Sequence, residues 1–281
     1  MSIAQPIHAP ADFPVADVQC TVRANRAVND RYRHLVLEAP PPLCRATPGQ
    51  FFHLLCPPAA GDEPFLRRPM SVYRIAPEER AIEFLYNVVG AGTRALARLT
   101  AGDTMSVMGP LGVGFTIAPA HRHVLMVARG VGLATMAPVV PWARRRGIRV
   151  TAVLSARAPE DLMEREFTQR EEVRVYPVFD RDASSDVGRV ETLLRAILDQ
   201  DRPDAMFTCG SNRLMTLLQR LGLEYGVPGE IALEQQMACA LGVCLCCVRP
   251  IRAGGAIVHK RVCCEGPVFD LQQVAGTWRH G

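Results

Sequence analysis

The feature that most constrains what this chain can fold into is the crowding of cysteines near its C-terminus. Six of the ten cysteines lie between positions 239 and 264, and Cys239, Cys244 and Cys247 follow the spacing C-x4-C-x2-C. An iron–sulfur cluster needs four thiolates that converge on a small volume, which a tight loop and one returning segment supply. The x4/x2 spacing is that of plant-type [2Fe–2S] sites, and Cys263 follows after a gap of fifteen residues as a candidate fourth ligand. The sequence therefore predicts a [2Fe–2S] cluster.

A structural zinc site is the competing interpretation. Its ligands would come from the same stretch: Cys244, Cys247 and Cys263, with His259 or Cys264. Such a site leaves Cys239 without a role, so the iron–sulfur interpretation is favoured. Cys246 and Cys264 exceed the needs of four-thiolate ligation, and we expect them to pack around the cluster.

Composition and charge limit the number of domains and the classes of partner that the chain can have. Of its 281 residues, 48% are hydrophobic and 21% are charged, which predicts two domains, or two with a small appendage. The net charge of +4 is too small and too scattered to indicate nucleic-acid binding. The first residues lack a basic segment followed by an apolar run, and no stretch approaches the ~20 apolar residues that span a bilayer. We therefore expect a cytoplasmic protein with no membrane segment and with reduced cysteines.

Short strands separated by turn residues fill the first part of the chain, residues 15–117. Alternation of apolar and polar residues, with Pro and Gly breaks, favours an antiparallel β-barrel or sandwich. The expected strands are 19–22, 33–37, 51–55 and 81–86, with a short helix at 93–99. The segment Gly109–Phe115, GPLGVGF, would close the barrel, and its three glycines permit close approach to a ligand or to the next domain.

Strands and helices alternate over residues 118–228, which indicates a doubly wound parallel α/β domain. The expected strands are 123–128, 149–154, 174–179 and 205–209, and the expected helices are 133–145, 161–169, 190–198 and 212–221. The alternation stops at Gly229, so residues 229–281 are expected to form a small third domain around the cysteines.

Two motifs of the barrel fit a flavin. The segment Arg67–Tyr73, RRPMSVY, ends a strand, where Arg68 offers a cation for a pyrophosphate and Ser71 a hydroxyl for the isoalloxazine N5. The segment Gly90–Thr93, GAGT, then opens a short helix whose free N–H groups suit an anion. Each motif alone is weak, because Arg-Pro beside a strand usually only ends an edge strand. Together, in a barrel that precedes a nucleotide-type domain, they predict a flavin site.

The order of motifs along the chain resembles one family. RPMS, GAGT, GPLGVGF, TCGS, MACALGVCLCC and RVCCEGPVF follow one another as in the electron-transfer subunit of NAD-dependent dihydroorotate dehydrogenase, in the ferredoxin reductase superfamily. The resemblance covers about residues 15–275 and is most specific over Glu234–Phe269. It implies that Cys263 is the fourth cluster ligand, since this residue occupies the cysteine of the family's V-C-x-x-G-P.

The resemblance also implies cofactor contacts and a partner. Gly130 and Gly132 would serve the nucleotide NAD(H), and FAD would be held by barrel residues: Arg68, Pro69, Met70, Ser71, Leu85, Tyr86, Asn87, Gly92 and Thr93. In the family, electrons pass between NADH, FAD, the [2Fe–2S] cluster and the FMN of a separate catalytic subunit that oxidises dihydroorotate. A hetero-oligomer with such a flavoprotein subunit is therefore expected.

Arg129 is the clearest departure from the family pattern. The family carries a G-G-G-x-G-like turn after the first strand of the nucleotide domain, where this chain has Ala128–Gly132, ARGVG. Arg129 would either crowd the nicotinamide or pair with a nucleotide phosphate. Cys209, in TCGS, occupies a position that lies near the nicotinamide in the superfamily, so it is the candidate neighbour of the hydride path; the alternative is a buried strand-end thiol. The choice between NAD and NADP stays open.

Two other functions fit the same motifs. One is a reductase component of another redox complex, such as a hydrogenase or an oxygenase, although the short gap before Cys263 argues against the oxygenase version. The other is a non-enzymatic redox sensor that changes partners when its cluster is oxidised or lost. The lack of a DNA-binding motif in the sequence counts against the sensor.

Overall fold

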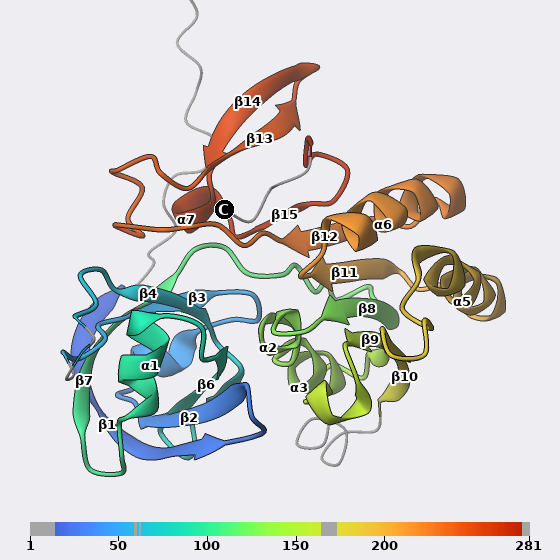
Figure 1. Cartoon of the computed structure of the whole chain (residues 1–281). Helices are drawn as coiled ribbons and strands as arrows, with labels where there is room; N and C mark the ends of the chain where they lie inside the picture. The colour runs from blue at the N-terminus through green and yellow to red at the C-terminus, as the bar shows by residue number, and fades with distance from the viewer. Residues whose placement is uncertain (1–14, 59–60, 62, 164–172, 277–281) are drawn as a thin grey trace, which may run out of the picture.

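The computed structural model of the chain describes residues 15–58, 61, 63–163 and 173–276. Its N-terminal part is a curled antiparallel sheet, drawn in blue and teal in Figure 1. The seven strands are ordered β4-β3-β7-β1-β2-β6-β5. They are β1 (Ala16–Ala27), β2 (Tyr32–Glu38), β3 (Phe51–Leu54), β4 (Arg68–Ser71), β5 (Arg74–Ala76), β6 (Ala81–Asn87) and β7 (Thr104–Leu111). The predicted antiparallel barrel is confirmed in the form of a half-open barrel.

Two short helical segments accompany the barrel: the 3-10 turn Leu43–Arg45 and helix α1 (Ala91–Ala97), two residues before the expected position. The barrel interior is apolar, and Phe52 meets Phe84 edge to face at 5.6 Å between ring centroids. Edge-to-face contact is a favoured arrangement of buried aromatic rings. This core packs against β4 and β6, the strands that carry most of the predicted flavin residues.

The second sheet has six strands in the order β10-β9-β8-β11-β12-β15. The strands are β8 (His123–Arg129), β9 (Arg149–Ala156), β10 (Arg174–Phe179), β11 (Ala205–Cys209), β12 (Gly229–Ala232) and β15 (Val268–Asp270). All neighbours are parallel except β12 and β15, so the predicted α/β domain is confirmed. Strands β8 and β11 lie side by side in the sheet although β9 and β10 come between them in the chain, which makes their carboxyl ends a topological switch point.

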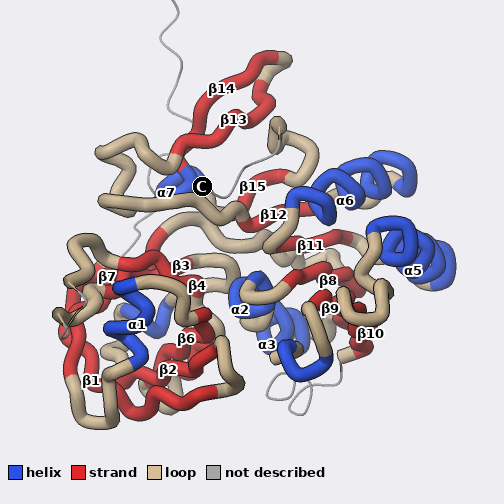
Figure 2. Tube along the Cα trace, viewed as in Figure 1, coloured by secondary structure: helices blue, strands red, loops and turns tan. Residues whose placement is uncertain are grey.

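Helices cover both faces of this sheet (Figure 2). Helices α2 (Gly132–Met136) and α3 (Val139–Arg144) lie on one face, and α5 (Val187–Gln200) and α6 (Asn212–Tyr225) lie on the other. The single helix expected over 133–145 is interrupted at Pro138, whose ring and missing N–H disfavour a helix interior. The helix expected over 161–169 lies mostly outside the described residues; its start belongs to the 3-10 turn Pro159–Asp161. No helix of the described part is long and apolar enough to cross a membrane.

The region after residue 229 contains more regular structure than the sequence predicted. Strands β13 (Val248–Ala253) and β14 (Ala256–Arg261) form a hairpin that projects at the top of Figure 1, and helix α7 (Val262–Glu265) follows it. Gly254 and Gly255 join the strands with φ of 57° and 81°, as a two-residue hairpin turn of this hand requires. The division into 15–117, 118–228 and 229–281 stays a prediction, and the last of these ranges contributes β12 and β15 to the six-stranded sheet.

One hydrophobic core joins the three regions. Phe51 of the barrel and Leu125 of the α/β sheet belong to the same buried cluster as Cys247, Ile251 and Cys263. The segment that closes the barrel also reaches the C-terminal region, because the Val113 N–H donates to the Gly266 carbonyl at 2.6 Å. The cysteine region is therefore packed onto both sheets.

Candidate functional site

The cysteine loop runs from β12 to β13 and curls around its own sulfur atoms. Three of its residues have a left-handed backbone, with φ between 57° and 78°: Ala240, Gly242 and Leu245. The curl aims N–H groups inward, and those of Leu241 and Cys244 donate to the Sγ of Cys239 at 3.4 and 3.5 Å. Backbone hydrogen bonds to ligand sulfur are one of the means by which a protein tunes an iron–sulfur cluster. The loop therefore presents backbone N–H groups to a ligand sulfur, while the assignment of the four cysteines as cluster ligands stays a prediction.

The four predicted ligands lie in two pairs. Cys244 bonds to Cys239 as just described, and the thiols of Cys247 and Cys263 contact each other. A [2Fe–2S] cluster takes two ligands on each of its two irons, so this donor set fits such a group. Among the described residues, no three His, Cys, Asp or Glu side chains already form a single-ion site.

The two pairs differ in burial. Cys247 and Cys263 are 2% and 1% exposed, whereas Cys244 lies at the surface and Cys239 is half-buried. The N–H of Cys246 lowers the pKa of Cys244 to about 6, and burial raises the pKa of Cys263. The predicted cluster site therefore extends from the shared core to the surface.

The two additional cysteines occupy different environments. The thiol of Cys264 is half-buried and lies against Gly242, where an added Cβ would come within 2.7 Å of its sulfur. Cys246 is exposed; its sulfur lies 3.3 Å from that of Cys244 and accepts the N–H of Ala238. The expected packing role therefore describes Cys264 better than Cys246.

The predicted pyrophosphate residues meet between β4 and α1. The side chain of Arg68 lies against Gly92, since an added Cβ on this glycine would be 2.5 Å from the guanidinium Nε. The Oγ1 of Thr93 accepts the N–H groups of Val89 and Gly90 at 2.9 and 3.0 Å, which fixes the turn before the helix. Arg68 and Gly92, 24 positions apart in the sequence, are thus brought into contact, which places a cation beside a compact glycine turn.

The remaining predicted flavin residues face different sides of the barrel. On β6, Leu85 faces the α/β domain, while the Tyr86 ring is buried in the barrel core and its hydroxyl bonds to Asn25. Tyr86 therefore has only backbone atoms available for a ligand. Pro69, Met70 and Asn87 are half-buried.

Four polar side chains meet where β4, α2 and β11 converge. Thr135 Oγ1 donates to the Ser71 hydroxyl at 2.8 Å, and the Cys209 thiol lies 4.0 Å from the Glu234 carboxylate. Cys209 is fully buried, and this burial raises its pKa. The sequence indicated Ser71 and Cys209 but not Thr135 or Glu234; Glu234 begins the most specific stretch of the resemblance, which was the available signal.

The predicted nucleotide glycines serve close packing of two loops. An added Cβ on Gly132 would lie 2.7 Å from the Cys209 carbonyl oxygen, and one on Gly210 would lie 2.6 Å from that of Arg129. Gly130 has a φ of 55°, with the Tyr32 hydroxyl nearby. These glycines let the turns after β8 and β11 meet at the switch point.

Arg129 has partners within the chain. Its guanidinium donates to both oxygens of Asp180, at 2.8 and 3.1 Å, and to the Ser155 hydroxyl at 2.7 Å. It thereby lowers the pKa of Asp180 to about 2. Ser155 lies on β9 and Asp180 directly follows β10, both on one side of β8 in the sheet, whereas Cys209 lies on β11, on the other side. The guanidinium therefore extends away from Cys209.

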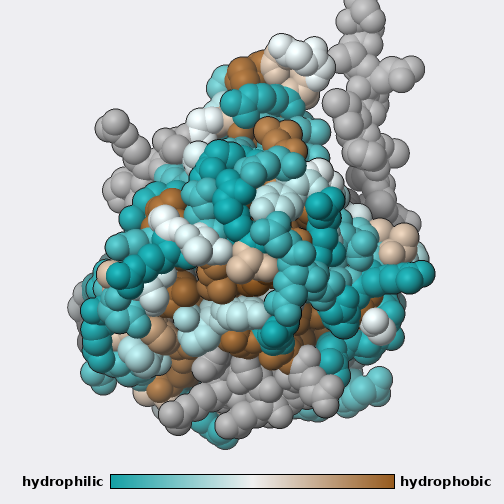
Figure 3. Space-filling view, turned by 90° about the vertical axis from the view of Figure 1, so that its right-hand side faces the viewer, coloured by the Kyte–Doolittle hydropathy of each residue, from teal (hydrophilic) through white to brown (hydrophobic). Residues whose placement is uncertain are grey.

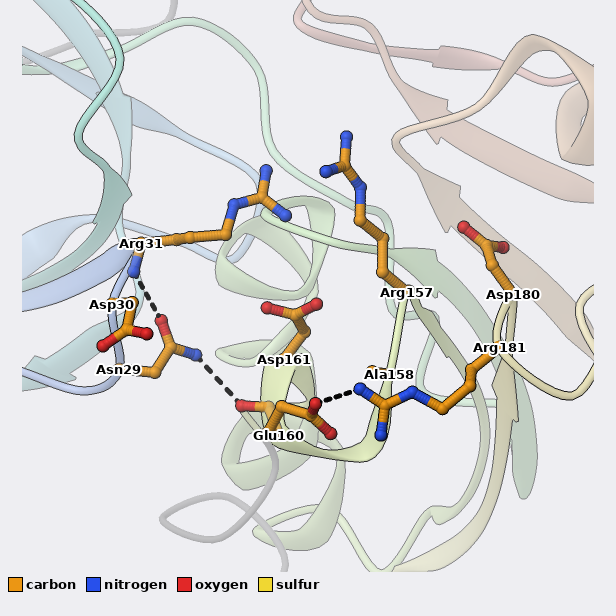
Figure 4. Close-up of a pocket in the computed structure, with 9 residues that line it drawn as sticks. All are labelled: Asn29, Asp30, Arg31, Arg157, Ala158, Glu160, Asp161, Asp180 and Arg181. Atoms are coloured by element: carbon orange, nitrogen blue, oxygen red, sulfur yellow. Dashed lines mark hydrogen bonds and ion pairs between the residues drawn. The ribbon is translucent and has the colours of Figure 1, made fainter.

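A cavity of about 740 Å³ lies beside this ion pair, between the barrel and the α/β domain (Figure 4). The barrel contributes the turn Asn29–Arg31, and the α/β domain contributes residues that follow β9 and β10: Arg157, Ala158, Glu160, Asp161, Asp180 and Arg181. Its volume is in the range of small-molecule sites. Its position beyond the carboxyl ends of parallel strands is where nucleotides bind in folds of this class.

Comparison with known proteins extends over most of the chain. Residues 234–275 match the iron–sulfur cluster binding domain of dihydroorotate dehydrogenase B. The chain is 34% identical over 242 residues to the electron transfer subunit of dihydroorotate dehydrogenase B (NAD(+)) of Desulforamulus reducens, covering 86% of this chain and 91% of that one. It is 31% identical over 258 residues to the same subunit of Geobacillus kaustophilus, covering 90% and 96%.

Solved structures share the fold. The NADH-dependent reduced ferredoxin-NADP oxidoreductase, studied for flavin-based electron bifurcation, matches with a TM-score of 0.76 and 27% identity over 91% of this chain and 89% of that one. The ferredoxin reductase in carbazole 1,9a-dioxygenase matches with a TM-score of 0.62 and 21% identity over 78% and 68%, which shows the fold alone. The iron–sulfur family match supports the iron–sulfur interpretation of the cysteines over zinc.

Proposed function

Because the chain belongs to the family of electron-transfer subunits of dihydroorotate dehydrogenase B, we propose that it relays electrons between NAD(H), FAD, a [2Fe–2S] cluster and a partner flavoenzyme. The partner would be a catalytic subunit that resembles dihydroorotate dehydrogenase, which would place the chain in pyrimidine biosynthesis. The flavin exchanges hydride and the cluster exchanges single electrons, so together they convert two-electron into one-electron transfer.

The observation that carries this proposal is the link between the two cofactor sites. Phe51 pairs with Ser71 across β3 and β4, and it belongs to the same buried cluster as Cys247 and Cys263. The buried pair of cysteines, Cys247 and Cys263, and the flavin motif therefore border one core. Such a core excludes water and holds both sites at a fixed separation.

The surroundings of Cys239 and Cys244, the outer cysteine pair, support the proposed partner contact. Leu241, Val243 and Leu245 surround this pair and are each more than half exposed, as an apolar docking surface would be before the partner binds. Ile257 and Val258 of the projecting hairpin are further exposed apolar residues, and Figure 3 shows hydrophobic residues at the top of the molecule, where this hairpin lies.

Ser71, Thr135, Cys209 and Glu234 are the residues that we assign to the reacting end of the flavin. The hydrogen bond from Thr135 orients the Ser71 hydroxyl, and the buried Cys209 keeps the space beside it free of water. The Glu234 carboxylate next to Cys209 is an acceptor or donor of a proton at the rim of the same space.

The experiment that tests the proposal is analysis of the purified protein for FAD, iron and acid-labile sulfide, followed by anaerobic titration with NADH. We expect about two irons and two sulfides per FAD, and loss of the visible flavin band on reduction. Zinc without acid-labile sulfide would contradict the cluster, and a flavin that neither NADH nor NADPH reduces would contradict the relay.

A second function is supported by the structural comparison. The fit to the NADH-dependent reduced ferredoxin-NADP oxidoreductase, at 27% identity over most of both chains, favours a reductase component of another redox complex as the alternative. Identification of the protein that co-purifies with this chain separates the two functions, because only one of them requires a dihydroorotate-oxidising subunit.

A further inference from the structure

Two arginines face one another across the cleft between the barrel and the α/β domain. Arg31 comes from the turn between β1 and β2, and Arg157 directly follows β9. In Figure 4 both side chains extend over the mouth of the cavity with their guanidinium groups toward each other. Like charges repel at short range, so this arrangement is favourable mainly when an anion lies between them.

The residues that the structure describes give neither guanidinium an ion-pair partner. The Arg31 guanidinium carbon lies over the Tyr32 ring, 5.7 Å from its centroid. The Arg157 side chain makes no hydrogen bond to any of the described residues. By contrast, the third arginine of the cavity, Arg181, is paired with Glu160. Two cations of the cavity are therefore available to a ligand.

One acid of the cavity is already paired. Asp180 lines the same cavity as Arg157, and both of its oxygens accept from Arg129. The remaining acids of the cavity are Asp30 and Asp161, and neither is within ion-pair distance of Arg31 or Arg157. Asp161 lies between and below the two guanidinium groups, where it can accept a sugar hydroxyl.

We propose that Arg31 and Arg157 form a phosphate clamp that closes the cleft on the ribose-phosphate part of a pyridine nucleotide. The proposal rests on the function proposed above. Planar guanidinium groups bind phosphate oxygens in pairs, and two of them from different domains would also fix the cleft width. The phosphate is either the 2′-phosphate of NADP(H), for which an arginine near the end of the second strand is the usual reader, or the pyrophosphate that NAD(H) shares.

Titration calorimetry of the flavin- and cluster-loaded protein with NADP⁺ and NAD⁺ tests the clamp. Arg31→Ala and Arg157→Ala are compared with Arg145→Ala, which removes an exposed arginine directly after α3 and outside the cavity. We expect each clamp variant to weaken binding at least about ten-fold, and the control to leave it unchanged. Added salt should reduce the difference between clamp variants and wild type.

The outcomes separate the sources of the phosphate. Loss confined to NADP⁺ identifies the 2′-phosphate, and equal loss for both nucleotides identifies the pyrophosphate. If wild type binds a nucleotide and both clamp variants bind it equally well, the clamp is refuted while the relay stands. If wild type binds neither nucleotide, both proposals fail.

Discussion

His53 offers a quantitative test of the barrel structure beside the flavin motif. It lies on β3 opposite Pro69, it is 1% exposed, and neither ring nitrogen has a hydrogen-bond partner. Burial, with the nearby cations Arg67 and Arg68, lowers its pKa from 6.5 to about 4. Burial penalises the charged imidazole, so the folded protein resists protonation there.

The effect on stability follows from proton linkage. Between pH 6.5 and about 4 the unfolded chain binds a proton that the folded chain does not, so the free energy of unfolding falls as the pH falls through this window. The whole change in the pKa of His53 corresponds to about 3 kcal/mol, reached only below pH 4. At pH 5 the loss relative to pH 7.5 is about 2 kcal/mol.

His53→Leu removes this titration. Urea unfolding of wild type and variant, followed by circular dichroism at pH 7.5 and pH 5, should show a stability difference that changes by about 2 kcal/mol in favour of the variant at pH 5. Other titrating groups are common to both proteins and cancel in the comparison. His259→Leu, at an exposed position of β14, is the matched control and should follow wild type. If the His53→Leu difference is the same at both pH values, the imidazole is not buried as described.

Three further changes test the cluster, the partner surface and the nucleotide cleft. Cys263→Ser should abolish or severely weaken iron binding, while Cys246→Ser and Cys264→Ser keep the iron content near normal; the opposite result for Cys263 and Cys264 would shift the ligand by one residue. Leu241→Asp should prevent co-purification of the partner and leave the FAD content unchanged, because the side chain is exposed at the outer cysteine pair; retention of the partner would contradict this surface. Arg129→Ala should leave the Asp180 carboxylate unpaired in the cleft, where it repels a phosphate, and weaken nucleotide binding about five-fold, the scale of an exposed ion pair; adding Asp180→Asn should restore it. Tighter binding in the single variant would instead support the steric interpretation of Arg129.

The strands of the parallel sheet were the most predictable part of the fold. Expected strands 174–179 and 205–209 coincide with β10 and β11, because both are short, mainly apolar runs rich in strand-forming residues. The hairpin β13–β14 was not predicted, although Gly254 and Gly255 are a typical two-residue hairpin turn between two strand-like runs. The return of β15 to the edge of the sheet depends on pairing with β12, 36 residues or more earlier in the chain, which a local pattern does not encode.

The same difference separates the cofactor residues that a short motif predicts from those that depend on contacts between distant parts of the sequence. Spacing and motif indicated the four cysteines, Arg68 and Ser71, because each lies in a short segment whose composition is unusual. Thr135 reaches Ser71 from 64 positions away, and nothing in its own surroundings marks it. Polar residues that act by meeting in space are therefore the ones that sequence reasoning misses.

Arg129 is the most informative example, because the sequence identified it as a departure but not what it contacts. Because the family has a glycine-rich turn at this position, the sequence predicted that Arg129 either obstructs the nicotinamide or binds a phosphate. The carboxyl ends of parallel strands share one edge of a sheet, and that edge brings Ser155 and Asp180 to Arg129 from 26 and 51 positions further along the chain. The guanidinium of Arg129 pairs with Asp180, one of the acids that line the cleft, and so offsets a negative charge there. In the proposed clamp, the positive charge that binds the nucleotide lies on Arg31 and Arg157, and Arg129 supports it by pairing this acid.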